Sequence, residues 1–278
     1  MPNANLQSAA IAKFRELHQS GCFVLPNPWD IGTAIFLQHL GFKALATTSA
    51  GFAFTRGKAD SQVSRDEMLA HIREIVQATP LPVNADYEAG YTDRPEDVAE
   101  NVKLCAETGV AGLSIEDNSR REDMPLYEKQ LAVERIRAAR RAIDVSGSGV
   151  VLTARCEAWL VGDANPLRTA LDRLVAYAEA GADCLYAPVV CAPNEIEQIV
   201  KAVAPKPINL LISGFNKEIS FSQAANLGVR RISVGSGLAL AAWGAFQRAA
   251  RDIQESGNFN LLGDGAKSAE LNGLFSKH

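Results

Sequence analysis

The chain has 278 residues, and 28 Lys and Arg against 32 Asp and Glu give it a formal net charge of -4. This slight excess of acid argues against nucleic acid or an anionic membrane as the main partner and favours a small molecule. With 47% hydrophobic and 22% charged residues, the chain can bury a sizeable core, which excludes a disordered or fibrous protein.

Eight short apolar runs along the chain predict β-strands. They lie at residues 23–26, 43–48, 82–86, 111–116, 150–154, 183–187, 207–212 and 231–235. Between them lie amphipathic segments with apolar residues at helical spacing, for example Arg65 to Ala78 and Pro95 to Glu107. The predicted order is therefore a strand followed by a helix throughout.

Glycines mark several helix ends directly before a strand, at Gly41, Gly109, Gly181 and Gly228. The repeated alternation favours parallel strands joined by crossover helices. We therefore predict the α/β class and a single domain over residues 1–278, a (β/α)8 TIM barrel with an extra C-terminal helical segment at about 260–278. An open doubly wound sheet is the main alternative.

Cysteine usage and hydropathy bear on location. The five cysteines form no Cys-x-x-Cys pair, so neither a zinc site nor a disulfide scaffold is expected. Residues 1–19 lack the apolar core of a signal peptide, and the apolar stretch 234–246 is too short to span a bilayer. We expect a cytoplasmic protein without a membrane segment.

Carboxylates follow two adjacent strands, at the end of the barrel where active sites of this fold lie. Asp86 and Glu88 come at the end of the third predicted strand, and Glu116 ends the fourth. Alternation along a strand points Asp86 and Glu88 to the same side. Carboxylates gathered at one mouth suit a hard divalent cation, Mg²⁺ or Mn²⁺. The alternative is that these acids cap helices or pair with a lysine.

An arginine follows the fifth strand. Arg155 and Glu157 share one side of the chain there, and the fixed charge and planar fork of Arg155 suit a substrate carboxylate or a developing oxyanion. A structural ion pair with a neighbouring carboxylate is the alternative. After the second strand, small residues from Thr47 to Gly51 would let backbone N–H groups approach an anion.

The four histidines lie away from the predicted strand ends. His18, His39 and His71 fall in helical segments and His278 is the last residue, which disfavours histidine catalysis and histidine-bound zinc. The sequence also lacks a G-x-S-x-G elbow, a Walker A motif and a strand-linked G-x-G-x-x-G. The chemistry that remains is carboxylates, one arginine and an oxygen-liganded metal.

With these residues in place, the chain resembles members of the isocitrate lyase and phosphoenolpyruvate mutase superfamily. The resemblance runs from Leu25 to the region of Gly235. The segments that match the family's motifs are Ser49-Ala50-Gly51, Asp60, Asp86-Tyr87-Glu88-Ala89-Gly90-Tyr91, Glu116 and Arg155-Cys156-Glu157-Ala158. Glu88 stands where the family has a second Asp.

The resemblance implies a barrel enzyme that depends on Mg²⁺ (or Mn²⁺) and acts on 2-oxo acids or their adducts. Its metal ligands would be Asp86, Glu88 and Glu116. Relatives of this kind are commonly homo-oligomers, so we expect a dimer or tetramer, and exchange of a C-terminal helix between subunits would suit the segment after Asn260.

The same resemblance implies an anion-binding loop for a substrate carboxylate or phosphonate. The expected substrate-binding residues are Ser49, Ala50, Gly51, Arg155 and Asn209.

Two departures from the family narrow the chemistry. The loop at residues 118–127 holds neither the Cys nor the His of the isocitrate and methylisocitrate lyases. Residues 185–188 read Leu-Tyr-Ala-Pro where the phosphonomutases carry a histidine. The charges from Arg120 to Asp123 are compatible with a lid over the site or with a solvated surface turn.

The leading hypothesis is a lyase that breaks a carbon-carbon bond of a 2-oxo or 2-hydroxy dicarboxylic or tricarboxylic acid and leaves a pyruvate-like enolate on the metal. Oxaloacetate decarboxylation and the cleavage of methylisocitrate or dimethylmalate are examples. The expected catalytic residues are Arg155, Glu157, Asp60 and Tyr87. Arg155 would stabilise the enolate, and Tyr87 or Glu157 would be the base that a hydroxy acid needs.

Three alternatives stay open. The first is phosphonate chemistry, as in a phosphonomutase or a phosphonopyruvate hydrolase. The second is a non-catalytic barrel that binds a dicarboxylate, and the third is a cysteine-based lyase.

Overall fold

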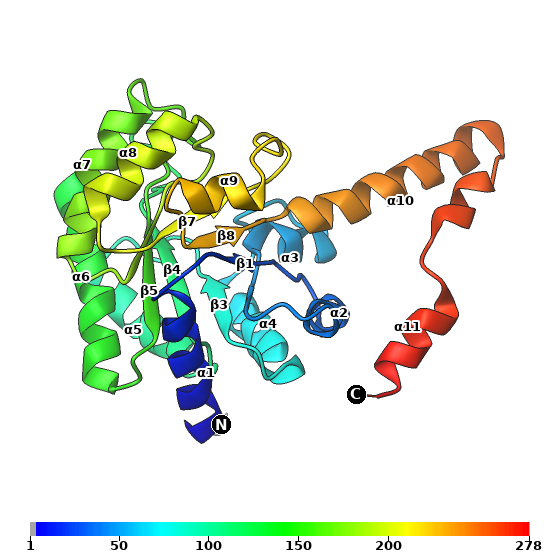
Figure 1. Ribbon diagram of the computed structural model, residues 1–278, viewed down its shortest axis with the longest axis horizontal. Coiled ribbons are helices and arrows are strands. Elements are labelled where there is room, and N and C mark those ends of the chain that lie inside the picture. Colours follow the sequence, from blue (N-terminus) through cyan, green and yellow to red (C-terminus); the bar gives the residue numbers. More distant parts are fainter. Residues whose placement is uncertain (1–3, 278) are drawn as a thin grey trace.

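Eight parallel strands form one sheet that curves into a nearly closed barrel in the computed structural model, which describes residues 4–277 (Figure 1). The strands are β1 (Phe23–Leu25), β2 (Leu45–Ala46), β3 (Val83–Asp86), β4 (Gly112–Glu116), β5 (Val151–Arg155), β6 (Cys184–Tyr186), β7 (Ile208–Leu211) and β8 (Arg231–Ser233). All eight predicted strands are confirmed, and every strand except β5 is shorter than its apolar run.

The barrel closes where the first and last strands meet. β1 pairs with β8, with Phe23 opposite Arg231. Between β1 and β2 no ladder forms, and a single backbone bond from Ala46 N to Pro26 O, 3.0 Å long, crosses the seam. Because the two ends of the sheet meet, the TIM barrel prediction is confirmed and the open doubly wound sheet is wrong.

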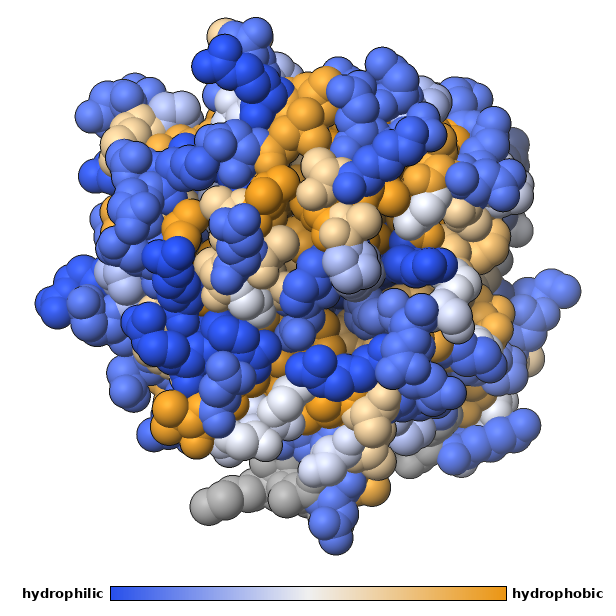
Figure 2. All heavy atoms as spheres, turned by 60° about the vertical axis from the view of Figure 1, so that its left-hand side comes forward, coloured by the Kyte–Doolittle hydropathy of each residue, from blue (hydrophilic) through white to orange (hydrophobic). Residues whose placement is uncertain are grey.

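Helices cover the outside of the barrel and occupy the positions that the alternation predicts. They are α1 (Ala4–Leu17), α2 (Ile31–His39), α3 (Ser49–Thr55), α4 (Arg65–Ala78), α5 (Pro95–Ala106), α6 (Lys129–Ser146), α7 (Pro166–Glu179), α8 (Pro193–Val203) and α9 (Phe221–Asn226). On the side formed by α6, α7 and α8, hydrophilic side chains predominate, with apolar residues between them (Figure 2).

Local sequence explains several helix ends. A capping box between Ser64 and Glu67 starts α4. Gly181 follows the last turn of α7 with φ 104°, a conformation that other residues avoid, and a Cβ there would lie 2.6 Å from Arg140 Cγ. The turn from α7 into β6 therefore requires glycine.

The barrel interior is closed at its amino end by α1. Phe14 is fully buried there, and a Cβ at Gly112 would come within 2.7 Å of its ring. Above this plug the interior is polar. Arg231 donates to Asn209 Oδ1 at 2.8 Å and to Thr153 Oγ1 at 3.0 Å. The cavity of the next section therefore opens at the carboxyl ends of the strands.

The C-terminal segment leaves the barrel. Helix α10 (Gly237–Ser256) extends away from it, and a short 3-10 helix (Asn260–Asp264) and α11 (Ser268–Phe275) run back toward α2 (Figure 1). This confirms the predicted extra helical segment. Among the described residues, no helix is both long and apolar enough to cross a membrane.

Candidate active site

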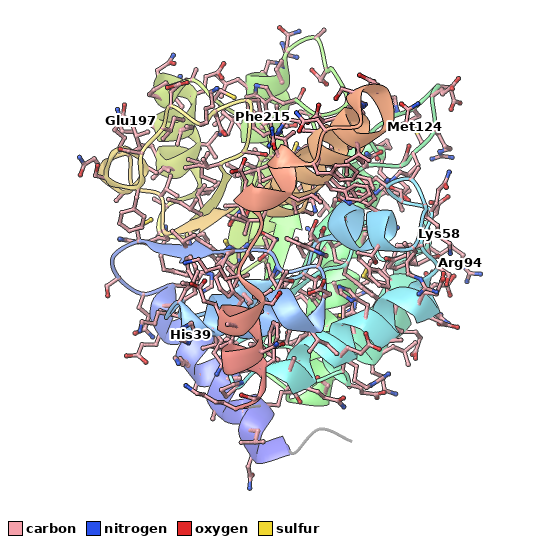
Figure 3. All side chains as sticks on the ribbon, turned by 90° about the vertical axis from the view of Figure 1, so that its right-hand side faces the viewer. His39, Lys58, Arg94, Met124, Glu197 and Phe215 are labelled. Atoms are coloured by element: carbon pink, nitrogen blue, oxygen red, sulfur yellow. The ribbon has the colours of Figure 1, made fainter. Side chains whose placement is uncertain are left out.

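A cavity of about 220 Å³ opens at the carboxyl ends of the strands. Of the residues predicted for the site, those that line it are Ser49, Ala50, Asp60, Asp86, Arg155 and Asn209. Polar side chains form one part of the lining, the polar wall, and apolar or aromatic side chains form the rest, among them Leu160, Tyr186 and Phe215. Figure 3 shows Phe215 at this end of the barrel, and His39 lies toward the other end.

Arg155 at the end of β5 is the centre of the polar wall. Its Nη1 lies 2.7 Å from Asp86 Oδ1, its Nη2 lies 3.1 Å from Glu116 Oε2, and its Nε lies 2.8 Å from Glu157 Oε1. The guanidinium also lies over the Tyr186 ring, 5.1 Å from its centre. Burial alone would lower the pKa of Arg155, but the surrounding carboxylates outweigh it and raise that pKa. The guanidinium is therefore fixed and charged.

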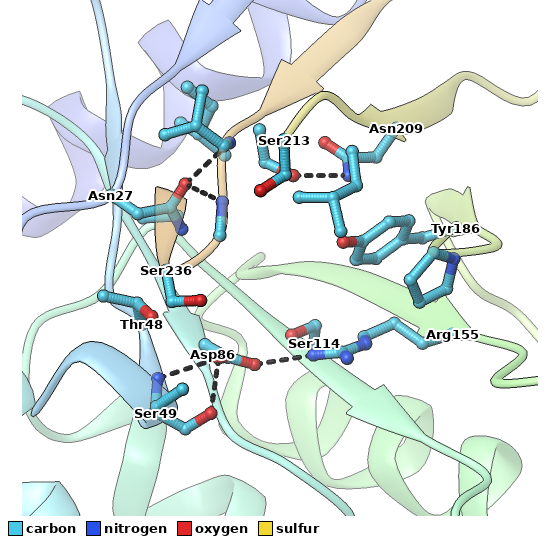
Figure 4. Close-up of a pocket in the computed structure, with 18 of the residues that line it drawn as sticks. Asn27, Thr48, Ser49, Asp86, Ser114, Arg155, Tyr186, Asn209, Ser213 and Ser236 are labelled. Atoms are coloured by element: carbon cyan, nitrogen blue, oxygen red, sulfur yellow. Dashed lines mark hydrogen bonds and ion pairs between the residues drawn. The ribbon is translucent and has the colours of Figure 1, made fainter. Parts of the chain in front are cut away.

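Asp86 at the end of β3 connects Arg155 to the loop after β2. Ser49 donates to Asp86 Oδ2 twice, through its backbone N at 2.9 Å and its hydroxyl at 2.8 Å (Figure 4). The Gly51 amide instead donates to Thr48 Oγ1 at 3.1 Å and caps α3. Ser49 and Ala50 therefore face the cavity, and Gly51 lies behind them, where a Cβ would meet Thr48 Cγ2 at 2.5 Å.

Glu88 and Glu116 form a second acidic group beside the cavity. Glu88 lies just beyond β3 with φ 48°, so it is not placed by strand alternation. Arg120, in the loop between β4 and α6, reaches both acids with the same nitrogen. Its Nη2 lies 2.7 Å from Glu116 Oε1 and 3.2 Å from Glu88 Oε2. The three predicted metal ligands therefore lie in one group, linked by Arg155, which contacts Asp86 and Glu116, and by Arg120, which contacts Glu116 and Glu88.

The pKa values of these acids reflect burial among like charges. Burial raises the pKa of Glu88 to about 7, against the opposing effect of Arg120 and with the help of the neighbouring acids. Burial also raises the pKa of Glu116, although Arg155 and Arg120 oppose it. At the cavity mouth, partial desolvation and the charge of Asp86 raise the pKa of Asp60.

The acidic side chains fit a divalent cation in kind and charge. They outnumber the two guanidinium groups among them, and the acids are Asp60, Asp86, Glu88, Glu116 and Glu157. The positions of these side chains in the structure, however, are not those of a set of metal ligands. Within residues 4–277, no group of three His, Cys, Asp or Glu side chains is arranged to hold a metal ion. Arg120 lies between two of the predicted ligands.

Two residues predicted as catalytic do not reach the cavity. Tyr87 is fully buried on the outer side of the strand, where its ring packs edge-on against Tyr91 at 5.1 Å. Since it lies next to Asp86 along the chain, strand alternation already turns it away from the mouth. Glu157 is also fully buried, behind Arg155. Neither side chain lines the cavity, so the geometry does not support either of them as the base.

Sequence reasoning missed several residues that shape the site. Asn27 accepts hydrogen bonds from the Val234 and Gly235 amides and donates to Thr47 O, so it joins the loops after β1, β2 and β8. Its place directly after the first strand was the available signal. Arg120 is the second such residue, because it contacts both Glu88 and Glu116, whereas the sequence indicates only its charge.

Histidine and cysteine are placed away from the cavity. Among the described residues, no histidine and no cysteine lines it, and His278 lies outside the described part of the chain. Burial raises the pKa of the Cys156 thiol, which lies next to Arg155 in sequence. This thiol is therefore in an inert environment.

Comparison with known proteins gives consistent matches. The family profile described as phosphoenolpyruvate phosphomutase matches residues 14–254. A solved structure from Burkholderia cenocepacia J2315, described only as a candidate lyase or mutase, is 45% identical, covers 98% of each chain and superimposes with a TM-score of 0.95.

Curated relatives are more distant. An uncharacterised protein of Mycobacterium tuberculosis is 33% identical over 228 residues, which are 80% of this chain and 81% of that protein. The 2-methylisocitrate lyase of Salmonella typhimurium is 33% identical over 187 residues, which are 64% of this chain and 59% of that enzyme.

Proposed function

The chain belongs to the isocitrate lyase and phosphoenolpyruvate mutase superfamily, and from that premise we propose that it is a carbon-carbon lyase. Its substrate would be a 2-oxo or 2-hydroxy acid with two or three carboxylates. The observation that carries this proposal is the Arg155 guanidinium, fixed by carboxylates from neighbouring strands and exposed to the cavity. A fixed cation beside a small cavity suits a reaction that develops negative charge on oxygen.

In this mechanism, Arg155 orients the substrate through its 2-oxygen or the adjacent carboxylate. For a 2-oxo acid such as oxaloacetate, cleavage of the C3–C4 bond releases CO2 and moves the electron pair toward the 2-oxygen, and Arg155 stabilises the resulting enolate before C3 is protonated. For a 2-hydroxy acid, removal of the hydroxyl proton turns C2 into the carbonyl of the 2-oxo product as the C2–C3 bond breaks, and the electron pair passes to C3 of the departing acid, which is then protonated. Because Asp86, Glu116 and Glu157 already hold the guanidinium, little reorganisation is needed during the reaction. Ser49 holds Asp86 in place from the opposite side.

A divalent cation, Mg²⁺ or Mn²⁺, is proposed as the cofactor. Asp86, Glu88 and Glu116 would hold it, and when bound it would supply Lewis acidity toward the substrate oxygens. The excess of carboxylates over guanidinium groups at this site supports the assignment.

Proton transfer falls to Asp60 in this proposal. With Asp86 paired to Arg155 and Ser49, Asp60 is the other carboxylate that lines the cavity. Its raised pKa suits a group that exchanges a proton with substrate. Decarboxylation of a 2-oxo acid needs no base to begin, whereas cleavage of a 2-hydroxy acid needs the hydroxyl proton to be removed.

The apolar wall bears on substrate choice. Leu160, Tyr186 and Phe215 line the cavity together with the polar residues, and Tyr186 lies against the Arg155 guanidinium. Such a wall accommodates an alkyl group next to the bond that breaks better than a third carboxylate. We therefore expect alkyl-substituted dicarboxylates to be better substrates than tricarboxylates.

A panel of oxaloacetate, methyl-substituted malates and methyl-substituted citrates, each with Mg²⁺, tests this function. Formation of a 2-oxo acid is measured by a coupled dehydrogenase assay, with Glu116→Gln as the matched control. Turnover by the natural chain and its loss in the variant are expected. Equal rates in both proteins would contradict the proposal.

The family profile's description supports one competing activity, chemistry at a phosphorus-carbon bond. Phosphorus NMR with phosphonopyruvate distinguishes the two, because only phosphonate chemistry removes the phosphonate signal. A protein that binds these acids tightly without turning any of them over would instead be a binding barrel.

We also propose that the chain works as a cytoplasmic homo-oligomer, a dimer or tetramer. Exposed apolar side chains on α10, including Leu240, Trp243 and Phe246, support this assembly.

A further inference from the structure

Arg120 occupies the position between two carboxylates that a cation would take. A single nitrogen, Nη2, contacts both Glu116 Oε1 at 2.7 Å and Glu88 Oε2 at 3.2 Å. The two acids come from different segments, the end of β4 and the loop after β3. The other oxygen of Glu88 accepts a hydrogen bond from the Tyr91 hydroxyl at 3.2 Å. Both oxygens of Glu88 are therefore engaged while Arg120 is in place.

The loop around Arg120 is folded so as to deliver this side chain inward. Arg120 itself has φ 62°, a conformation that a non-glycine residue keeps only when its surroundings enforce it. Its backbone N–H donates to Asn118 Oδ1 at 2.9 Å, and Ser119 N donates to Pro125 O at 2.9 Å. Asn118 and Leu126 form a bridge at the base of the loop.

The neighbouring residues differ from Arg120. Arg121 and the two acids after it are exposed, and no ion pair of their side chains is found among the described residues. Arg120 is therefore the side chain that this loop directs onto the acidic group, and Arg121 offers the same charge at an adjacent exposed position. The pair provides a matched comparison.

We propose that Arg120 is an internal counter-ion that competes with the divalent cation for Glu88 and Glu116. This inference rests on the metal ligands named under the proposed function. A guanidinium and a divalent ion repel each other, and both would need the same carboxylate oxygens. Binding of the cation therefore requires Arg120 to leave, and with it the loop at residues 118–127 loosens.

This competition couples the loop to the cation in both directions. By linkage, a cation that expels Arg120 shifts the loop toward its released conformation, and removal of Arg120 strengthens cation binding by the same factor. Without the cation, Arg120 neutralises part of the buried acidic charge. Arg120 thereby lowers the repulsion between the carboxylates of Glu88 and Glu116.

Mn²⁺ binding to the purified full chain, followed by electron paramagnetic resonance without substrate, tests the proposal. Arg120→Gln is expected to bind Mn²⁺ about fivefold more tightly or better, the lower range of coupling between linked sites. Arg121→Gln removes the same charge from the exposed neighbour, and its affinity is expected to stay near that of the natural chain. Asp86→Asn identifies the site by weakening binding in either background.

The possible outcomes are distinct. Equal or weaker Mn²⁺ binding by Arg120→Gln, with binding still lost in Asp86→Asn, overturns the competition and leaves the metal site standing. An equal gain in Arg120→Gln and Arg121→Gln also overturns it, because general charge would then be the cause. Absence of Mn²⁺ binding in all these proteins overturns both this inference and the proposed metal ligands.

Hydrogen exchange provides a second readout that does not depend on affinity. Addition of Mg²⁺ alone is expected to speed amide exchange in residues 118–127 of the natural chain and to leave exchange in Arg120→Gln unchanged. Slower exchange of this loop in the natural chain with Mg²⁺ would contradict the proposal, because it would mean that the cation tightens the loop.

Discussion

At the scale of single residues, the site is built from side chains whose charges depend on one another. Arg155 touches Asp86, Glu116 and Glu157, so no member of this group can be changed without affecting the charge balance of the rest. This mutual dependence is the basis on which we propose that the group binds a substrate anion and a divalent cation.

Replacement of Arg155 by Lys should lower kcat by roughly 100-fold, a magnitude typical for loss of one fixed donor to a developing oxyanion. Lysine keeps the charge but not the planar fork that contacts several carboxylates at once. Steady-state kinetics on the substrate identified by the panel measure this loss. Arg94→Lys, at an exposed arginine, should leave kcat unchanged, and a similar kcat for both variants would contradict the role of Arg155.

The raised pKa of Glu88 predicts that the folding stability of the metal-free protein depends on pH. Because the pKa of Glu88 is about 7 when folded and near its ordinary value of 4.5 when unfolded, folding stability falls as pH rises through this window. Glu88→Gln removes this penalty. The variant should be more stable than the natural chain by roughly 1 to 3 kcal/mol at pH 8, and the difference should vanish near pH 4.5.

Urea unfolding at both pH values, with a chelator present, measures the effect. A destabilised Glu88→Gln at pH 8 would show that the bonds from Arg120 and Tyr91 outweigh the cost of burying the charge.

Sequence reasoning found the charged residues of the site but not all of their roles. Asp86, Arg155 and Asp60 line the cavity as expected. Tyr87 does not line the cavity, and its ring packs against Tyr91 instead. The contact of Arg120 could not be predicted, since it depends on the conformation of a loop and on a positive φ that no local pattern requires.

At the scale of elements, the seam between β1 and β2 is the weakest part of the barrel. The apolar run at 43–48 predicted a longer strand, but only Leu45–Ala46 forms a ladder, with β3. Asn27 compensates by bonding to both sides of the seam. The apolar pattern of the sequence predicts that a strand is present. The length of its ladder depends on how closely the neighbouring strand approaches, which the pattern does not contain.

Asn27→Ala should therefore destabilise the fold by about 2 to 4 kcal/mol, because Asn27 is buried and its loss leaves buried backbone groups without partners. It should also weaken substrate binding, since Val234 and Gly235 line the cavity. Chemical denaturation and KM measure the two effects. Asn194→Ala, at an exposed position on α8, should change stability by less than about 0.5 kcal/mol. Equal stabilities of the two variants would refute the role of Asn27.

At the scale of the whole molecule, the C-terminal segment has more exposed faces than a helix packed on a monomeric globular protein. On α10 only Ala239 is buried, while Trp243 is 38% exposed and Phe246 is 61% exposed. Their rings stack edge-on, 5.5 Å apart. The described part of the chain leaves both of these side chains exposed, which supports the oligomer that we propose.

Double replacement of Trp243 and Phe246 by Glu should convert the assembly into monomers, because charges would replace the apolar side chains that we expect the interface to bury. Light scattering after gel filtration compares the mass with the 29.8 kDa of one chain. Val145→Glu alters an apolar side chain that is 89% exposed on α6 and should leave the assembly intact. A natural chain that already runs as a monomer would refute the prediction.

Helix α10 begins immediately after Val234, Gly235 and Ser236, which line the cavity. A Cβ at Gly51 would lie only 3.3 Å from the Ala239 methyl group, so the first turn of α10 also supports the loop that holds Asp86. We therefore expect a neighbouring subunit that binds the outer end of α10 to affect the cavity wall through this helix. Specific activity should then depend on protein concentration, declining on dilution as subunits part.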